Sequence, residues 1–294
     1  MIKKINRRQF LQRSFAGAAV LGSGVANLSY DYRSTGVIDR VKLGSTGLTV
    51  PRIALGTGSR GGGRASNQTR LGMEAFVKLA RHAYDRGLKF YDMADLYGSH
   101  QYVREVLKQV PREETILLTK IWTTQTNWLE EQTPGEMIDR FRAECRTDYF
   151  DIVLLHCLLN GRWQEEKKDF IDALSKAKQD GIIKTVGVSC HNWDAMKVAV
   201  EDPWVDVILA RINPFHNHMD GTPPDVMGLL ETARRNGKGV IGMKIFGNGD
   251  NTSAEEREKS LSFALKSQDI HCMTLGLESD VQIDDAVSRV IRLT

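Results

Sequence analysis

The chain has 294 residues, of which 41% are hydrophobic and 26% are charged. These proportions are typical of a soluble globular protein, and the length suits a single α/β barrel. The formal net charge of +3 is uneven, because residues 1–26 hold five Lys/Arg and no Asp/Glu and the remainder therefore carries −2. No basic surface remains to favour a nucleic-acid partner.

The N-terminal residues resemble a twin-arginine export signal. Asn6-Arg-Arg-Gln-Phe-Leu-Gln12 precedes a mildly apolar run, and Gly24-Val-Ala26 offers a cleavage site of small residues. The run is too short and too rich in glycine for a stable membrane span. A basic amphipathic arm is the alternative. We therefore expect residues 1–26 to be a signal read by the twin-arginine export machinery, residues 27–36 to be a polar linker, and the protein to be exported, periplasmic or extracytoplasmic.

The next segments predict a hairpin followed by eight strands. Residues 41–50 predict a short hairpin that turns at Gly44–Gly47. Each strand that follows is short and apolar on both faces, as a parallel strand covered by helices should be. The eight predicted strands are Arg52–Gly56, Lys89–Met93, Ile116–Lys120, Asp151–His156, Thr185–Ser189, Val205–Ile212, Gly239–Ile245 and Cys272–Leu277.

Segments with a helical period separate the strands. Thr133-Pro-Gly-Glu136 and Ser253-Ala-Glu-Glu256 are capping boxes that predict helix starts, and residues 280–293 predict a final helix. Eight β/α repeats predict a (β/α)8 TIM barrel over residues 37–294, with a short N-terminal β-hairpin.

A glycine pattern favours a competing fold. Gly56-Thr-Gly-Ser-Arg-Gly61 matches the dinucleotide fingerprint and follows a predicted strand. However, no second strand ends on an acidic residue about 20 residues later, as that fold requires. The segment continues as Gly61-Gly-Gly-Arg64, which predicts a flexible loop, so the barrel is the better interpretation. The glycines would still allow close approach of the backbone to a ligand.

Ionisable residues end three successive predicted strands. Asp92, Lys120 and His156 occupy these positions, and Tyr97 lies on the turn after Asp92. In such barrels the functional groups gather at the carboxyl ends of the strands. A buried lysine needs a partner, and Asp92 is the obvious one. An internal ion pair that only fixes the rim is the alternative, but two further hydrogen-bonding groups at the same rim favour a catalytic site.

This arrangement resembles the aldo-keto reductase family over residues 41–293. The resemblance includes Leu43-Gly-Ser-Thr-Gly47, Ala54-Leu-Gly-Thr-Gly58 and Val186-Gly-Val-Ser189 as well as the four ionisable residues. It implies an NAD(P)H-dependent oxidoreductase that interconverts a carbonyl (aldehyde, ketone or sugar) and its alcohol by hydride transfer.

The resemblance also implies a role for each of the four residues. Tyr97 would be the general acid/base that protonates the carbonyl oxygen. An isolated phenol has a pKa of about 10, and we expect the Lys120 ammonium to lower it. Asp92 would keep the lysine charged and oriented, and His156 would hydrogen-bond the substrate carbonyl.

Cofactor positions match the family unevenly. Leu209 stands where a glutamine is usual, and no Arg or Lys stands where a 2′-phosphate is normally held. The resemblance implies NADP as the cofactor, and the missing Arg or Lys leaves NAD as an alternative. Cys190 replaces the usual asparagine, and Ala286 replaces another. The expected cofactor-binding residues are Ser189, Cys190, Lys244, Gly276, Gln282 and Asp285. Lys244 would lie near the cofactor or the substrate.

Two other functions remain open. His191, His216, His218 and Asp220 follow the fifth and sixth predicted strands, and His-x-His can chelate Zn²⁺ in a metal-dependent barrel hydrolase. The four cysteines show no metal-ligand spacing and predict no disulfide. The departures in the cofactor positions would suit an NAD(P)-binding, redox-sensing protein without turnover.

Two tryptophans follow the third and fourth predicted strands. Trp122 and Trp163 could line the substrate site. Packing in the core is an equally good interpretation of each, because an indole ring is largely apolar.

Overall fold

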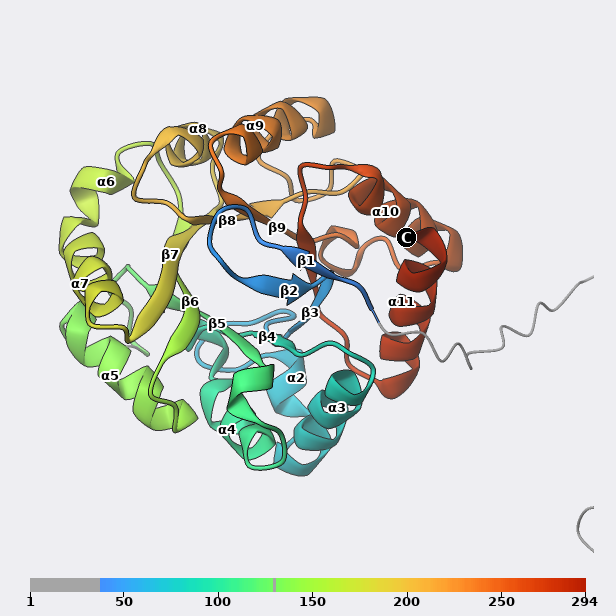
Figure 1. Cartoon of the computed structure of the whole chain (residues 1–294), viewed down its shortest axis with the longest axis horizontal. Helices are drawn as coiled ribbons and strands as arrows, with labels where there is room; N and C mark the ends of the chain where they lie inside the picture. The colour runs from blue at the N-terminus through green and yellow to red at the C-terminus, as the bar shows by residue number, and fades with distance from the viewer. Residues whose placement is uncertain (1–37, 129–130) are drawn as a thin grey trace, which may run out of the picture. The chain divides into compact units, whose positions relative to one another are not determined.

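The computed structural model describes residues 38–128 and 131–294, so the predicted signal and linker lie outside the described residues. Within these ranges eight parallel strands close into a barrel, each paired to the next and the last to the first (Figure 1). The strands are β3 (Ile53–Gly56), β4 (Phe90–Asp92), β5 (Ile116–Trp122), β6 (Phe150–Leu158), β7 (Ile183–Cys190), β8 (Val207–Arg211), β9 (Gly239–Met243) and β10 (Cys272–Leu275). All eight predicted strands and the barrel itself are confirmed.

Helices surround the barrel. They are α2 (Asn67–Arg70), α3 (Met73–Asp85), α4 (His100–Leu107), α5 (Pro134–Cys145), α6 (Trp163–Glu166), α7 (Lys168–Gln179), α8 (Trp193–Glu201), α9 (Pro223–Arg235), α10 (Ala254–Lys266) and α11 (Asp280–Leu293). Both predicted capping boxes form at the starts of α5 and α10. Short 3-10 turns, η1 (Asp95–Tyr97), η2 (Arg112–Glu114) and η3 (Gly247–Gly249), lie between them.

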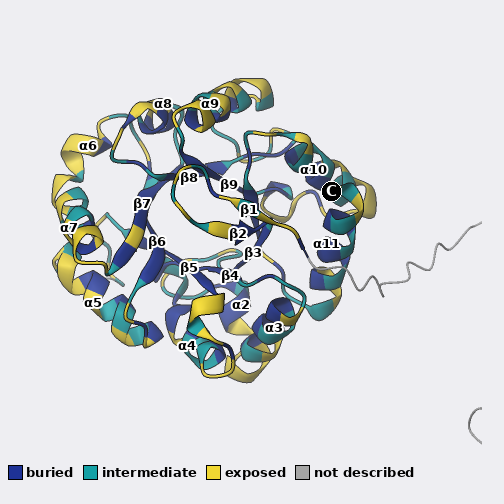
Figure 2. Cartoon of the chain, in the orientation of Figure 1, coloured by how far each residue is buried: buried dark blue, intermediate teal, exposed yellow. Residues whose placement is uncertain are grey.

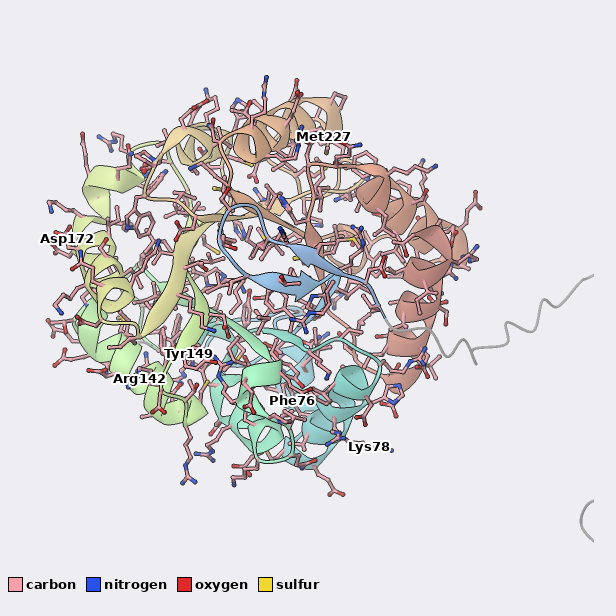
Figure 3. The ribbon with its side chains drawn as sticks, viewed as in Figure 1. Phe76, Lys78, Arg142, Tyr149, Asp172 and Met227 are labelled. Carbon is pink, nitrogen blue, oxygen red and sulfur yellow. The ribbon has the colours of Figure 1, made fainter. Side chains whose placement is uncertain are left out.

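The outer helices have one apolar face and one polar face. On α3, Phe76 is buried while Lys78, two residues later, is exposed, and Asp172 of α7 is exposed as well (Figures 2 and 3). The helices therefore bury their apolar faces against the strands, and each large side chain buried in this way contributes about 1.5–3 kcal/mol. No helix in the described ranges is long and apolar enough to cross a membrane.

The predicted hairpin covers one end of the barrel. Strands β1 (Arg40–Lys42) and β2 (Thr49–Pro51) pair antiparallel and cross the barrel opening that faces the viewer in Figure 1. Leu43 and Val50 belong to the same buried apolar cluster as the barrel interior, and the Ser45 amide donates to the Gly237 carbonyl at 2.7 Å. Gly237 precedes β9, so the covered end is the amino end of the strands.

The barrel interior determines which side chains reach the opposite end. The interior cluster includes Phe90 of β4, Leu118 of β5, Leu154 of β6 and Leu209 of β8. Because side chains alternate along a strand, the residue two positions further on points to the same side. Those residues are Asp92, Lys120, His156 and Arg211, which brings ionisable groups together at the carboxyl end.

The four cysteines, all in the described part of the chain, are free thiols in the structure. Cys145, Cys190 and Cys272 are buried, and Cys157 is half-buried.

Candidate active site at the carboxyl end of the barrel

A buried ion pair lies at the base of the site. The Lys120 ammonium donates to Asp92 and, at 3.0 Å, to the backbone oxygen of Met93. The Thr274 hydroxyl of β10 donates to the other Asp92 oxygen at 2.7 Å. Lys120 is 1% exposed and Asp92 is 5% exposed. Since both charges are paired and hydrogen-bonded, the desolvation cost of burying them is offset.

The tyrosine and the histidine face each other above this pair. The Tyr97 hydroxyl, on the η1 turn, lies 3.4 Å from His156 Nε2, and the two rings meet edge to face at 5.5 Å between centroids. Lys120 Nζ lies 4.8 Å from the centroid of the Tyr97 ring. The structure therefore brings Asp92, Tyr97, Lys120 and His156 together, as the sequence predicted.

The protonation states differ from one expectation. Burial, followed by the Asp92 carboxylate, raises the pKa of Tyr97 well above its ordinary value. The predicted lowering of this pKa is wrong, because the effects of burial and of the Asp92 carboxylate outweigh that of the Lys120 ammonium, 4.8 Å from the ring centroid. Burial, with the charge of Lys120, holds the pKa of His156 well below its usual range. At neutral pH the site therefore holds a protonated phenol and a neutral imidazole.

Two glycines leave room for the tyrosine ring. A Cβ atom added at Gly58 would lie 2.3 Å from a ring carbon of Tyr97, and one added at Gly61 would lie 2.6 Å from another. Both belong to the glycine pattern that resembles a dinucleotide fingerprint. The close approach that the sequence suggested is thus to Tyr97 in this structure.

A polar network holds the turn that carries Tyr97. Asp95, which begins η1, is fully buried and accepts two hydrogen bonds from Arg140 of α5, at 2.9 and 2.8 Å. Glu144 joins Arg140 at 3.1 Å and His100 at 2.8 Å, and His100 also contacts Thr119 at 2.7 Å. Bidentate arginine–carboxylate pairs fix geometry as well as charge.

Sequence reasoning missed this network and the Thr274 contact. The capping box that begins α5 was the one available signal, since it fixes the helix on which Arg140 lies.

Ser189 and Cys190 lie on opposite faces of β7. Cys190 is buried in the outer apolar cluster together with Val186 and Val188, so Ser189 faces the barrel interior by alternation. The Ser189 hydroxyl is buried and has no hydrogen-bond partner among the described residues. A buried hydroxyl without a partner is costly, and the carboxamide of a nicotinamide would satisfy it. The residues at this position therefore fit that cofactor.

The predicted residues of the C-terminal motif lie around the start of α11. Gly276 follows β10, and Gln282 accepts a hydrogen bond from the Glu278 amide at 2.8 Å. Asp285 accepts from Arg257 at 2.9 Å and from Arg289 at 2.9 and 3.0 Å. Both side chains are thus engaged within the protein.

Three of the four candidate metal ligands have other partners. Asp220 is paired with Arg211, and His218 Nε2 lies 2.9 Å from Asp250. His191 Nε2 lies 3.9 Å from the Cys157 sulfur. The described part of the chain contains no group of three or more His, Cys, Asp or Glu placed to hold a metal ion.

The two tryptophans have different surroundings. Trp122 meets His156 edge to face at 5.3 Å and Trp128 at 5.9 Å, and its indole nitrogen is buried without a partner in the described ranges. Trp122 therefore adjoins the site. Trp163 instead donates to the Ala195 carbonyl at 3.3 Å and packs against Trp204, so it is a core residue.

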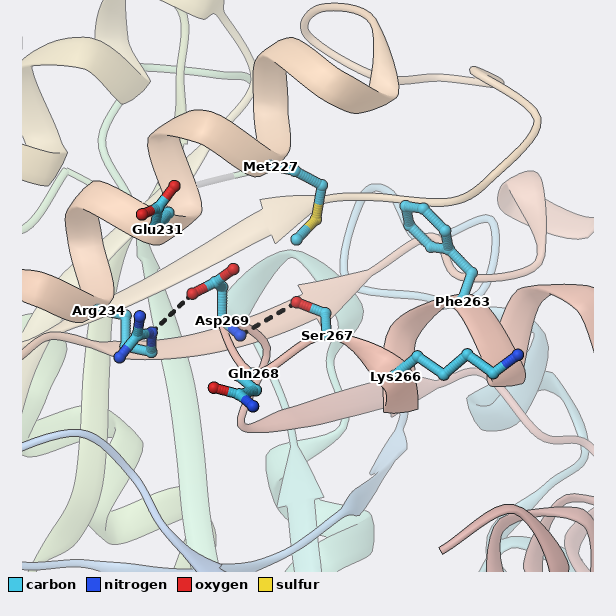
Figure 4. Close-up of a pocket in the computed structure, with 8 residues that line it drawn as sticks. All are labelled: Met227, Glu231, Arg234, Phe263, Lys266, Ser267, Gln268 and Asp269. Atoms are coloured by element: carbon cyan, nitrogen blue, oxygen red, sulfur yellow. Dashed lines mark hydrogen bonds and ion pairs between the residues drawn. The ribbon is translucent and has the colours of Figure 1, made fainter.

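A groove elsewhere on the molecule is lined by none of the predicted site residues. A groove of about 510 Å³ lies between α9 and α10 and is bordered by Met227, Phe263 and the Arg234–Asp269 ion pair (Figure 4). Convergent hydrogen-bonding groups and shifted pKa values mark functional sites, and both are found at the barrel end.

Fold and site together define the protein as a (β/α)8 barrel enzyme whose reactive groups lie at the carboxyl ends of its strands. A model of the Aldo/keto reductase family matches residues 52–290. The chain belongs to this family, and it is an NAD(P)-dependent oxidoreductase.

The chain is similar in sequence to several known oxidoreductases and in structure to several solved aldo-keto reductases. It is 26% identical over 248 residues to L-galactose dehydrogenase of Arabidopsis thaliana, covering 80% of this chain and 75% of that protein. It is 24% identical over 222 residues to the NADH-specific methylglyoxal reductase of Escherichia coli, covering 67% of this chain and 64% of that protein. The structure of an aldo-keto reductase of Bombyx mori in complex with NADP matches with a TM-score of 0.65 at 17% identity, covering 88% and 92% of the two chains.

Proposed function

We propose that the protein reduces a carbonyl compound, or oxidises the corresponding alcohol, with Tyr97 as the general acid/base. The single observation that carries this proposal is the contact between the protonated Tyr97 hydroxyl and the neutral His156 ring above a buried Lys120–Asp92 pair. The relatives act on sugars and small carbonyl compounds according to their names, which supports this substrate class.

We propose one task for each of the four residues. Bound nicotinamide would supply the hydride for the carbonyl carbon. Tyr97 Oη gives its proton to the carbonyl oxygen, and Lys120, next to the ring, stabilises the negative charge left on the phenol. His156 Nε2 orients the carbonyl by a hydrogen bond, and Asp92 holds Lys120 in place.

Ser189 on β7 and Lys244, which follows β9, are proposed cofactor contacts, together with Gly276, Gln282 and Asp285 around the start of α11. We infer NADP as the cofactor. NAD is the alternative, because neither Gly276 nor Gln282 supplies the positive charge that a 2′-phosphate requires.

Titration with NADPH and NADH, followed by a panel of aldehydes, ketones and sugars, tests this function. We expect quenching of tryptophan fluorescence on binding, since Trp122 adjoins His156, and turnover of at least one carbonyl class. Binding without any turnover would favour the redox-sensing alternative. Failure to bind either nucleotide would refute the proposal.

We also propose that the protein is exported by the twin-arginine machinery. The support is the sequence of residues 6–26, with Arg7 and Arg8 before an apolar run. Changing both residues to Lys keeps the charge, and it should leave the protein in the cytoplasmic fraction. Immunoblots of cell fractions measure this result. Unchanged export of the Arg7→Lys/Arg8→Lys variant would contradict the proposal.

A further inference from the structure

The sixth barrel strand places a cation at the carboxyl end of the barrel. Arg211 follows Leu209 by two residues on β8, so it points to the interior side, and it is in register with Met243 of β9. Arg211 Nε donates to Asp220 at 3.0 Å, and Nη2 donates to the other oxygen of the same carboxylate. The Asp220 side chain is 1% exposed. Nη1 of Arg211 forms no hydrogen bond with the described residues and the side chain is 17% exposed, so one edge of the guanidinium is available to a ligand.

A second cation lies next to it. Lys244 directly follows Met243 and is only partly exposed. Its backbone φ of 56° is in the left-handed region, where residues other than glycine are uncommon and often functional. Its ammonium has no hydrogen bond or ion pair with the described residues. Burial, together with the charge of Arg211, lowers its pKa.

A neutral histidine completes the cluster. His191, just beyond β7, lies 3.9 Å from the sulfur of Cys157, the residue after His156. Burial and the charges of Arg211, Lys244 and Lys120 lower the pKa of His191 to about 3, so the ring is neutral and can donate one hydrogen bond. Arg211, Lys244 and His191 therefore face one region beside the catalytic His156.

The charges in this region do not balance. Asp92 neutralises Lys120 and Asp220 neutralises Arg211, whereas no described carboxylate pairs with Lys244. A half-buried cation without a counter-charge is costly, and a bound anion removes that cost. We propose that Lys244, Arg211 and His191 form an oxyanion subsite next to the carbonyl position, which binds a carboxylate or a phosphoryl group.

The identity of the anion in this subsite rests on the proposed function, because that function supplies the candidate ligands. The oxyanion can belong to the cofactor, as its phosphate next to the nicotinamide ribose, or to an acidic carbonyl substrate. Arginine and lysine bind both groups through charge-assisted hydrogen bonds. Two pairs of probes that differ in one anionic group distinguish these sources.

The cofactor pair is reduced nicotinamide mononucleotide and reduced nicotinamide riboside, whose affinities are measured by tryptophan quenching. The substrate pair is 4-carboxybenzaldehyde and 4-methylbenzaldehyde, compared by kcat/KM. We expect Lys244→Met to weaken the anionic member of one pair about tenfold to a hundredfold, and its neutral partner by less than about twofold. The affected pair identifies the source of the anion, and Lys244→Arg should restore most of the loss.

Two further variants keep the test specific. Lys197→Met on α8 removes a surface charge that pairs with Asp194 at 2.7 Å, and it should change neither pair. The double variant Arg211→Met/Asp220→Met removes a buried ion pair as a unit, so no carboxylate is left without a partner, and it should resemble Lys244→Met.

The proposal and the proposed function can fail separately. Unchanged ratios within both pairs in Lys244→Met, in a protein that binds NADPH or NADH, would overturn the subsite and leave the oxidoreductase function intact. If the wild type binds no nicotinamide and reduces no carbonyl, calorimetry with inorganic pyrophosphate decides. If the wild type binds pyrophosphate and Lys244→Met does not, the subsite is supported without the proposed function. If the wild type binds no pyrophosphate, the subsite is overturned.

Discussion

Tyr97→Phe is expected to lower kcat for carbonyl reduction about 10²- to 10⁴-fold, while the affinity for NAD(P)H changes by less than about twofold. The substitution removes one hydroxyl and keeps the ring that packs against Gly58 and Gly61, so the fold should be unaffected. Steady-state kinetics and fluorescence titration of the same preparation measure both quantities. Tyr102→Phe, on α4, is the matched control, and its kinetics should equal those of the wild type.

The pH profile provides a second check on Tyr97. A general acid works while it is protonated, and the pKa of Tyr97 is raised well above its ordinary value by burial and by Asp92. The pKa of His156 is held well below its usual range. Reduction should therefore be flat from about pH 7 to about pH 9 and decline only as the pH rises toward the phenol pKa. Retained kcat in Tyr97→Phe, or a decline centred near neutral pH, would exclude Tyr97 as the acid.

Lys120→Met is expected to reduce both stability and turnover. Removing one partner of a buried ion pair leaves the Asp92 carboxylate without its counter-charge, at a cost of about 3–5 kcal/mol in the free energy of unfolding. Turnover should decrease as well, because the ammonium 4.8 Å from the Tyr97 ring centroid no longer stabilises negative charge on the phenol. Denaturant unfolding and steady-state kinetics measure the two effects.

A double variant separates these effects. In Lys120→Met/Asp92→Leu both charges are absent, so most of the stability should return while turnover stays low. Arg142→Met, on α5, removes a surface cation that pairs with Asp139 and should change neither quantity. If the stability of Lys120→Met equals that of the wild type, the Lys120–Asp92 ion pair does not contribute to the free energy of unfolding as expected. Recovery of turnover in the double variant would show that the lysine has no role in the reaction.

The sequence predicted the barrel well because each strand is a short apolar run between recognisable helix starts. The capping boxes at Thr133 and Ser253 fixed two helix boundaries, and eight repeats leave few architectures to choose from. Asp92, Lys120 and His156 could be placed together because they share one position relative to their strands. That inference needs only the parallel order of the barrel.

Contacts between distant segments could not be predicted in this way. Arg140 and Asp95 are 45 residues apart, and Thr274 and Asp92 are 182 residues apart. No local pattern identifies such partners, since their meeting depends on how helices and strands pack. The direction of the Tyr97 pKa shift was predicted wrongly for a related reason, because the burial of the ring and its closeness to the Asp92 carboxylate depend on how the chain packs.

The hairpin covers the amino end of the barrel, so the residues that stabilise this end lie apart from the residues proposed to take part in the reaction. Leu43 and Val50 pack against the interior side chains at the amino end, and the reactive groups lie at the carboxyl end. Substitutions far apart without shared partners usually have additive effects on stability. Stabilising changes at the covered end, such as a tighter hairpin turn or a new surface ion pair, should therefore add to the stability without altering the contacts of the reactive groups. The amino end of the barrel is therefore a suitable place to engineer greater stability, because it lies away from the reactive groups.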